Sequence, residues 1–138
     1  MTAENRRILI IDDERPILLT LEALLGRHGY QPETAATASY GLRVLQNNPP
    51  AVVLLDLQLP DADGLQMLEQ IKRDHPDLPA VMISGHGNIE TAVAAIKRGA
   101  YDFLEKPFKS DRLIRVATQA IAKSSTSNET KIEAATGN

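Results

Sequence analysis

The chain has 138 residues, of which 43% are hydrophobic and 24% charged, a composition typical of one globular domain with a single core. The absence of cysteine excludes disulfides, thiolate metal sites and cysteine nucleophiles. A net charge of -3 provides no basic surface, so we expect no direct binding of nucleic acid by this chain.

The chain starts with a short polar segment that lacks the apolar core of a signal peptide. No later segment approaches the ~20 consecutive apolar residues of a membrane helix. We therefore expect a cytoplasmic protein without membrane contact.

Two strand–helix pairs are predicted in the first third of the chain. Residues 8–11 form an apolar run typical of a buried strand, and leucine and isoleucine at helical spacing predict a helix over 16–28. Residues 31–36 are a weaker strand candidate, and a second helix over 39–47 stops at the Asn-Asn-Pro-Pro segment that follows.

A third pair surrounds a single aspartate. Residues 51–55 predict a continuous apolar strand that leads into Asp56. Asp63 is placed to cap the next helix, which His75-Pro76 breaks.

The last two pairs repeat this arrangement. Residues 80–83 predict a strand, followed by a helix over 88–98 whose first residue, an asparagine, caps it. Residues 101–104 predict the fifth strand, and Asp111 is placed to cap a final helix that extends to about Lys123.

Five strand–helix pairs joined by short loops predict an α/β fold in which helices cover both faces of a parallel sheet. We assign residues 6–123 to this domain. The small and polar residues of 124–138 predict a linker or a disordered tail.

Polar side chains follow four of the five predicted strands. In chain order they are Asp12 and Asp13, Asp56, Ser84 and Lys106. Doubly wound sheets bind ligands at the carboxyl ends of their strands, so we expect these side chains to form one site. Singly, each residue is a common turn or capping residue, and only the ordered set indicates a site.

This set of side chains suits phosphoryl transfer. Three neighbouring carboxylates repel one another unless a cation offsets their charge, and Mg²⁺ prefers one or two carboxylates together with a phosphoryl oxygen. Asp56 can then attack a phosphoryl group as a carboxylate nucleophile. The Lys106 ammonium, the Ser84 hydroxyl and Mg²⁺ are suited to stabilise the charge on the phosphoryl oxygens.

Four segments carry a more specific pattern. They are Ile10-Ile11-Asp12-Asp13-Glu14, Leu54-Leu55-Asp56-Leu57-Gln58-Leu59-Pro60-Asp61 with Asp63-Gly64, Ile83-Ser84-Gly85, and Lys106-Pro107-Phe108. Over about residues 6–123 the sequence thereby resembles the receiver domains of bacterial two-component response regulators. The resemblance implies a single doubly wound, flavodoxin-like receiver fold, with five helices and five parallel strands in the order 2-1-3-4-5.

The resemblance also implies residue roles. Asp56 would be the phosphoacceptor, Lys106 would pair with the phosphoryl group, and Ser84 would turn inward to hydrogen-bond it. A cis peptide bond would precede Pro107. The implied ligands of Mg²⁺ are Asp12, Asp13, Asp56 and the backbone carbonyl of Gln58.

Four positions would relay the phosphorylation or set its lifetime. The switch residues implied are Ser84 and Phe103; spacing from the lysine favours Phe103 over Tyr101, with simple core packing as the alternative for Phe103. Gln58 and His86, two residues beyond the phosphoacceptor and the hydroxyl residue, would tune the lifetime of the phosphoryl group. His86 is equally explained as an ordinary loop residue.

The segments 84–92 and 99–108 are most similar to the nitrogen-regulation group of response regulators, whose receivers precede an ATPase that activates sigma-54 RNA polymerase and a DNA-binding domain. The resemblance implies a histidine kinase as the phosphoryl source and an output domain or partner protein that controls transcription.

We predict that phosphorylation shifts the population toward a state that exposes the 88–122 face for a homodimer or another partner. A wide apolar band on the last helix favours this prediction. Its residues are Leu113, Ile114, Val116, Ala117, Ala120 and Ile121.

Three other classes of protein share part of this pattern. A stand-alone receiver or phosphorelay intermediate that acts through protein–protein contacts stays open. A haloacid-dehalogenase-like phosphatase would need Asp-x-Asp after the first strand, where this chain has Asp12-Asp13-Glu14. A flavodoxin is disfavoured because no Ser/Thr/Gly-rich phosphate loop follows that strand. We expect a regulator rather than an enzyme, limited to self-phosphotransfer and slow self-dephosphorylation.

Overall fold

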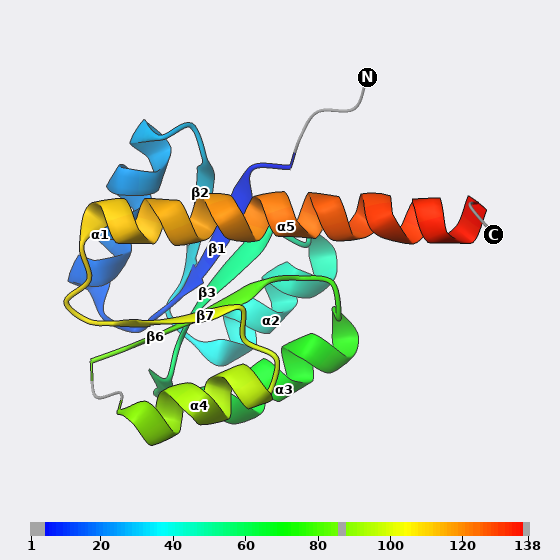
Figure 1. The fold of residues 1–138 in the computed structure, drawn as a ribbon. Helices are drawn as coiled ribbons and strands as arrows, with labels where there is room; N and C mark the ends of the chain where they lie inside the picture. Colours follow the sequence, from blue (N-terminus) through cyan, green and yellow to red (C-terminus); the bar gives the residue numbers. More distant parts are fainter. Residues whose placement is uncertain (1–4, 86–87, 137–138) are drawn as a thin grey trace.

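The computed structural model describes the backbone of residues 5–85 and 88–136 and the side chains up to residue 123. The strands of its central sheet are β1 (Arg7–Ile11), β2 (Gln31–Ala35), β3 (Val52–Asp56), β6 (Ala80–Ser84) and β7 (Asp102–Glu105). All neighbouring strands are parallel, in the order β2-β1-β3-β6-β7 (Figure 1). Because β6 and β7 are the fourth and fifth strands of this sheet in chain order, the predicted order 2-1-3-4-5 is confirmed.

The helices are α1 (Arg15–Arg27), α2 (Ala38–Asn47), α3 (Gly64–Asp74), α4 (Ile89–Lys97) and α5 (Ser110–Thr136). One core cluster joins α1 and α5 to one face of the sheet, and a second joins α2, α3 and α4 to the other. Figure 1 shows this division, with α1 and α5 on one side of the strands and the other helices opposite. The predicted double covering of the sheet is therefore confirmed.

The central strands β1, β3 and β6 each carry an uninterrupted apolar run because each face of the sheet carries helices. In β1, Ile8 and Ile10 belong to the cluster with α1 and α5, whereas Leu9 and Ile11 belong to the other cluster. All four side chains are fully buried. This alternation explains why an uninterrupted apolar run, rather than a two-sided pattern, marks these strands in the sequence.

Local hydrogen bonds fix where the helices begin. Asp63 caps α3 by accepting the Leu65 N–H at 2.9 Å, and Asn88 caps α4 by accepting the Thr91 N–H at 2.8 Å, as predicted. The prediction that Asp111 caps the last helix is wrong, since α5 begins at Ser110 and Asp111 lies inside its first turn. A carboxylate is still favourable there because the N-terminus of a helix carries partial positive charge.

The last helix differs from its prediction in two further respects. It continues to Thr136 instead of ending near Lys123, and neither proline nor glycine interrupts residues 110–136. The wide apolar band that favoured a partner-binding face is mostly core, and within it only Ile114 is partly exposed. The buried members of the band are Leu113, Val116, Ala117, Ala120 and Ile121.

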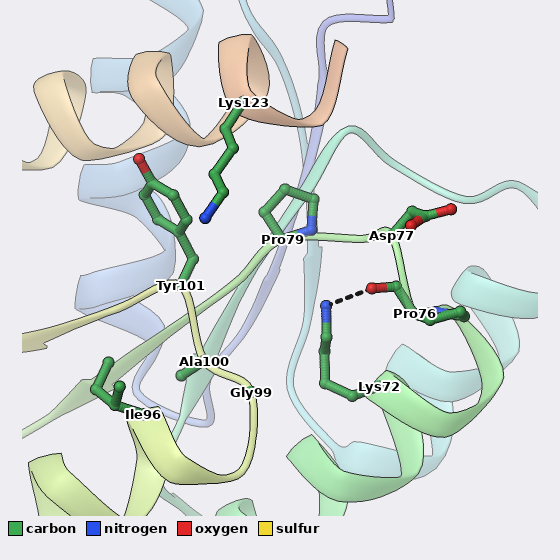
Figure 2. Close-up of a pocket in the computed structure, with 9 residues that line it drawn as sticks. All are labelled: Lys72, Pro76, Asp77, Pro79, Ile96, Gly99, Ala100, Tyr101 and Lys123. Carbon is green, nitrogen blue, oxygen red and sulfur yellow. Dashed lines mark hydrogen bonds between the residues drawn. The ribbon is translucent and has the colours of Figure 1, made fainter. Parts of the chain in front are cut away.

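A cavity of about 410 Å³ lies where β6 and β7 begin, between the ends of α3 and α4 and the α5 residue Lys123. Figure 2 shows the Lys72 ammonium turned toward the Pro76 carbonyl, to which it donates a hydrogen bond of 2.9 Å. A second bond, of 2.8 Å, reaches the Leu78 carbonyl. Lys72 therefore fastens the connection between α3 and β6, at the end of the sheet opposite to that where α/β folds bind ligands.

Within the part of the chain that the structure describes, no helix is both long and apolar enough to cross a membrane.

Candidate functional site

The predicted site residues meet at the carboxyl edge of the sheet. Parallel pairing places Ile11 beside Leu55, and Asp56 beside Ile83. It also places Ser84 beside Glu105. Because four strands end at the same level, the side chains that terminate or follow them share one edge, as the sequence predicted.

Three carboxylates form the acidic part of this edge. Carboxylate oxygens of Asp12, Asp13 and Asp56 all lie within 4.8 Å of one another. Asp12 is fully buried and Asp56 only 5% exposed, whereas Asp13 is exposed to solvent. Oxygen ligands at this spacing could hold a metal ion, which would offset the repulsion between the charges.

Lys106 supplies the positive charge of the edge. Its Nζ lies 2.7 Å from Asp12 Oδ2, 2.8 Å from Glu14 Oε1 and 3.6 Å from Asp56 Oδ2. The backbone N–H of Lys106 donates to the Ser84 carbonyl at 2.7 Å, and the Lys106–Pro107 peptide bond is cis, as the sequence predicted. The ammonium is thus engaged more closely by Asp12 and Glu14 than by Asp56.

One carboxylate oxygen of the acidic cluster has no hydrogen-bond partner. Asp12 Oδ1 accepts the Glu14 N–H at 2.9 Å. Asp12 Oδ2 is close to Lys106 but does not meet the geometry of a hydrogen bond, and it is the one buried side-chain oxygen or nitrogen without a hydrogen-bond partner among the described residues. A buried carboxylate oxygen in this state, beside two further carboxylates, fits a hard cation such as Mg²⁺.

Burial changes the proton affinity of the two central groups. Burial raises the pKa of Asp56 from 3.8 to about 6, and the neighbouring Asp12 charge adds to this, against the lowering effects of the Gln58 N–H and of Lys106. Burial alone would lower the pKa of Lys106, but its contacts with Asp12 and Glu14 outweigh burial and raise that pKa. Lys106 is therefore a permanent cation at neutral pH.

A cavity of about 340 Å³ opens above Asp56. Ser84 is almost fully buried at its wall, and the Gln58 N–H donates to Asp56 Oδ1 at 3.2 Å. The lining residues are Asp13, Glu14, Asp56, Gln58, Leu59, Pro60, Ser84, Gly85 and Lys106. A small group bound to Asp56 in this cavity would contact the ammonium and the hydroxyl together.

The loop after Asp56 is held close to the strand by a glycine. Gly64 donates its N–H to the Leu57 carbonyl at 2.8 Å, and a Cβ at this position would lie 2.6 Å from the Asp56 carbonyl oxygen. Only glycine allows α3 to start so near the end of β3. The intervening residues form a two-stranded antiparallel ladder of β4 (Gln58–Leu59) and β5 (Ala62–Asp63).

Two residues of this edge had no role assigned from the sequence. Glu14 pairs with Lys106, as described above. Asp61 accepts the Ala38 N–H at 2.8 Å and the Ser39 N–H at 3.1 Å, which joins the loop after β3 to the start of α2. Both lie inside the motifs that the sequence displayed, but nothing in a motif specifies a contact with a distant element.

The predicted switch residue Phe103 and the alternative Tyr101 lie on opposite faces of the sheet. Phe103 is partly buried against the cluster shared by α2, α3 and α4, whereas Tyr101 packs against the opposite cluster. Lys123 lies over the Tyr101 ring, 5.3 Å from its centroid. His86 lies outside the described residues.

Comparisons with known proteins agree on one family. Residues 8–118 match the family model described as response regulator receiver domain. The nitrogen assimilation regulatory protein NtrX of Azorhizobium caulinodans is 51% identical over 116 residues, which are 83% of this chain and 26% of that protein. The chain therefore spans about a quarter of the length of this relative.

Solved structures give the same result. The receiver domain of NtrX from Brucella abortus is 51% identical, with a TM-score of 0.80 and coverage of 83% of this chain and 98% of that one. The beryllofluoride-activated NtrC4 receiver domain dimer is 39% identical, with a TM-score of 0.83 and coverage of 86% and 98%.

Proposed function

The chain belongs to the response-regulator receiver family, and on this basis we propose that it accepts a phosphoryl group on Asp56 from a histidine kinase in a Mg²⁺-dependent reaction. The observation that carries the proposal is the convergence of Asp56, the acidic cluster and the Lys106 ammonium at one cavity. No single one of these features would distinguish a receiver site from an ordinary strand end.

Asp12, Asp13, Asp56 and the backbone carbonyl of Gln58 are the residues that would hold Mg²⁺. Asp12 Oδ2, which has no hydrogen-bond partner and contacts only the Lys106 ammonium among the described ion pairs, supports this assignment. When bound, the ion would neutralise the carboxylates and the charge of the phosphoryl group. Because it would also favour the ionised form of Asp56, it would lower the pKa of that carboxyl and keep the nucleophile ionised below neutral pH as well.

The nucleophile of the reaction is the ionised Asp56. One carboxylate oxygen attacks the phosphorus atom, a P–O bond forms, and the P–N bond to the phosphohistidine of the kinase breaks with its electron pair passing to nitrogen. Lys106 then pairs with a phosphoryl oxygen, and the Ser84 hydroxyl donates to another. Gln58, which lines the cavity, and His86 are the positions proposed to set the phosphoryl lifetime.

We propose that Ser84 and Phe103 relay phosphorylation to the 88–122 face. The exposed surface of α4 supports this part of the proposal, because Ile89, Val93 and Ile96 are 83%, 45% and 49% exposed and lie along one side of the helix. Arg112 lies 3.8 Å from Asp102 of the same chain. The beryllofluoride-activated NtrC4 receiver is a dimer, which supports a homodimer as the consequence proposed here.

The output is proposed from the relatives. NtrX is named as a regulator of nitrogen assimilation, and the matching segment is only part of that protein. We propose that this receiver likewise regulates a transcriptional output domain in the cytoplasm, and that residues 124–138 connect the two. In this scheme the chain is a switch and not an enzyme acting on external substrates.

Intact-mass measurement after incubation with acetyl phosphate and Mg²⁺ tests the proposal. We expect a gain of one phosphoryl group in the wild-type chain and none in Asp56→Asn. Chelation of Mg²⁺ should abolish the gain. An equal gain in Asp56→Asn would contradict the assignment of the phosphoacceptor.

A further inference from the structure

Glu14 forms an ion pair with Lys106, whose ammonium is the group that a phosphoryl group on Asp56 would need. Its carboxylate lies 2.8 Å from Lys106 Nζ, while Asp56 Oδ2 lies 3.6 Å away. This inference rests on the proposed phosphorylation of Asp56, in which the Lys106 ammonium must turn toward a phosphoryl oxygen.

The two acidic partners of Lys106 differ in burial. The Asp12 side chain is fully buried, whereas the Glu14 side chain is 58% exposed. Glu14 precedes the first residue of α1, makes no side-chain cap of that helix, and lines the cavity above Asp56. It therefore reaches Lys106 from the solvent side, the side from which a phosphoryl donor arrives.

Of the two acidic partners of Lys106, the exposed Glu14 is the one that can release the ammonium. An ammonium has three N–H donors, and the Lys106 side chain that carries them is only 9% exposed. Releasing Asp12 would strand a buried charge, a strongly unfavourable step. Releasing the exposed Glu14 leaves its carboxylate accessible to water, and exposed ion pairs contribute little.

We propose that Glu14 is a positioning residue that holds Lys106 in the unphosphorylated protein and competes with the phosphoryl group for its ammonium. The pair keeps Lys106 at the mouth of the cavity and opposes its move toward Asp56. Glu14 thereby restrains phosphorylation, and acyl-phosphate formation separates it from Lys106.

Three variants separate this role from a simple charge effect. Glu14→Gln removes the charge. Glu14→Asp keeps the charge but shortens the side chain by one methylene, which takes it out of contact with Lys106. Glu105→Gln is the matched control, because Glu105 is exposed at the end of β7, next to Lys106 in sequence, and has no ion pair within the described residues.

Phosphorylation of each protein is followed by intact mass over a series of acetyl phosphate concentrations, with saturating Mg²⁺. For a competing carboxylate, we expect the half-saturating concentration to fall roughly two- to fivefold in both Glu14 variants, with the maximal rate unchanged. Glu105→Gln should match the wild type. Urea unfolding of each variant checks that the fold is intact.

Three results would overturn the inference. A Glu14→Asp variant that behaves as wild type while Glu14→Gln reacts faster would show that charge alone matters. A lower maximal rate in Glu14→Gln would mean that Glu14 assists the reaction, and unchanged kinetics would mean that it has no part. Failure of the proposed function is separate, since the wild-type chain would then gain no phosphoryl group on Asp56.

Discussion

Lys106 Nζ lies 3.6 Å from Asp56 Oδ2, farther than the 2.7 Å that separates it from Asp12 Oδ2. The ammonium therefore compensates the buried charge of Asp56 only in part. This agrees with a pKa of Asp56 near 6, since desolvation and the Asp12 charge outweigh the attraction of Lys106. The ionised form of Asp56 is therefore unfavourable in the folded protein until a cation or a covalently bound group offsets its charge environment.

Replacing Asp56 by asparagine should stabilise the metal-free protein at neutral pH. The folded protein keeps a proton on Asp56 up to about pH 6, whereas the unfolded chain releases it near 3.8. Ionisation therefore destabilises the fold progressively between about pH 4 and pH 6, and the loss persists above. We expect Asp56→Asn to raise the free energy of unfolding in urea by about 2 kcal/mol at neutral pH and to have little effect near pH 4. Asp74→Asn, at the exposed end of α3, is the control, and a gain that is equal at both pH values would contradict the explanation.

Adding Mg²⁺ should stabilise the wild-type protein against heat. A ligand that binds only the folded state raises Tm, by about 4 °C at ten times its Kd for a domain of this size. Asp13→Asn should lose most of this increase, because Asp13 is the exposed member of the acidic cluster and can be changed without disturbing the core. Glu22→Gln removes an exposed charge on α1 and should keep the increase. The metal assignment would be wrong if Mg²⁺ raised the Tm of Asp13→Asn as much as that of the wild type.

An alanine at position 64 should disturb the site loop. Its Cβ would approach the carbonyl oxygens of Asp56 and Leu57, so α3 would have to move away from β3. We expect Gly64→Ala to lower the free energy of unfolding in urea by about 2 kcal/mol or more. Gly26→Ala is the contrasting variant, because nothing lies within 4 Å of its Cβ and α1 should gain roughly 0.5–1 kcal/mol. Equal effects in the two variants would show that the close approach is unimportant.

Removing Asp61 should weaken the start of α2 in a pH-dependent way. Hydrogen bonds from the Ala38 and Ser39 N–H groups hold the pKa of Asp61 below its usual 3.8. The sign follows from this lowering: the stabilisation is present above about pH 4 and is lost as the pH falls through the folded pKa. We expect Asp61→Ala to lower Tm at neutral pH and much less near pH 2. A difference in Tm that does not change with pH would point to packing instead.

Changing the exposed face of α4 should weaken self-association of the phosphorylated protein. Ile89 is the most exposed large hydrophobic residue described, at 83%. We expect Ile89→Ser to reduce the dimer fraction after treatment with beryllofluoride and Mg²⁺, measured by sedimentation, while phosphorylation of Asp56 is unaffected. Leu19→Ser, 54% exposed on α1 at the other face of the sheet, is the matched control. Loss of the dimer in Leu19→Ser alone would show that the interface lies on α1 and not on α4.

Most of the fold could be predicted because its signals are local. The apolar runs at 8–11, 51–55 and 80–83 are short, uninterrupted and followed by polar residues, which is how strands buried on both faces appear in a sequence. The caps of α3 and α4 are equally local, since Asp63 and Asn88 bond to amides two and three residues ahead.

The last helix was the least predictable element for a physical reason. An apolar band on one helix does not reveal whether a neighbouring surface covers it. Here α1 and the sheet bury Leu113, Val116 and Ile121, whereas α4 exposes Ile89, Val93 and Ile96. Only packing decides which of two amphipathic helices presents its apolar side to solvent.

The sequence by itself determined which side chains meet at the site. Asp12, Asp56, Ser84 and Lys106 each end or follow a parallel strand, and parallel strands bring their carboxyl ends to one edge whatever the rest of the chain does. The tertiary structure alone decided how those groups share charge. Which carboxylate engages Lys106, how far burial raises the pKa of Asp56, and that Asp61 reaches α2 all depend on distances of a few ångströms between separate elements, which no local pattern encodes.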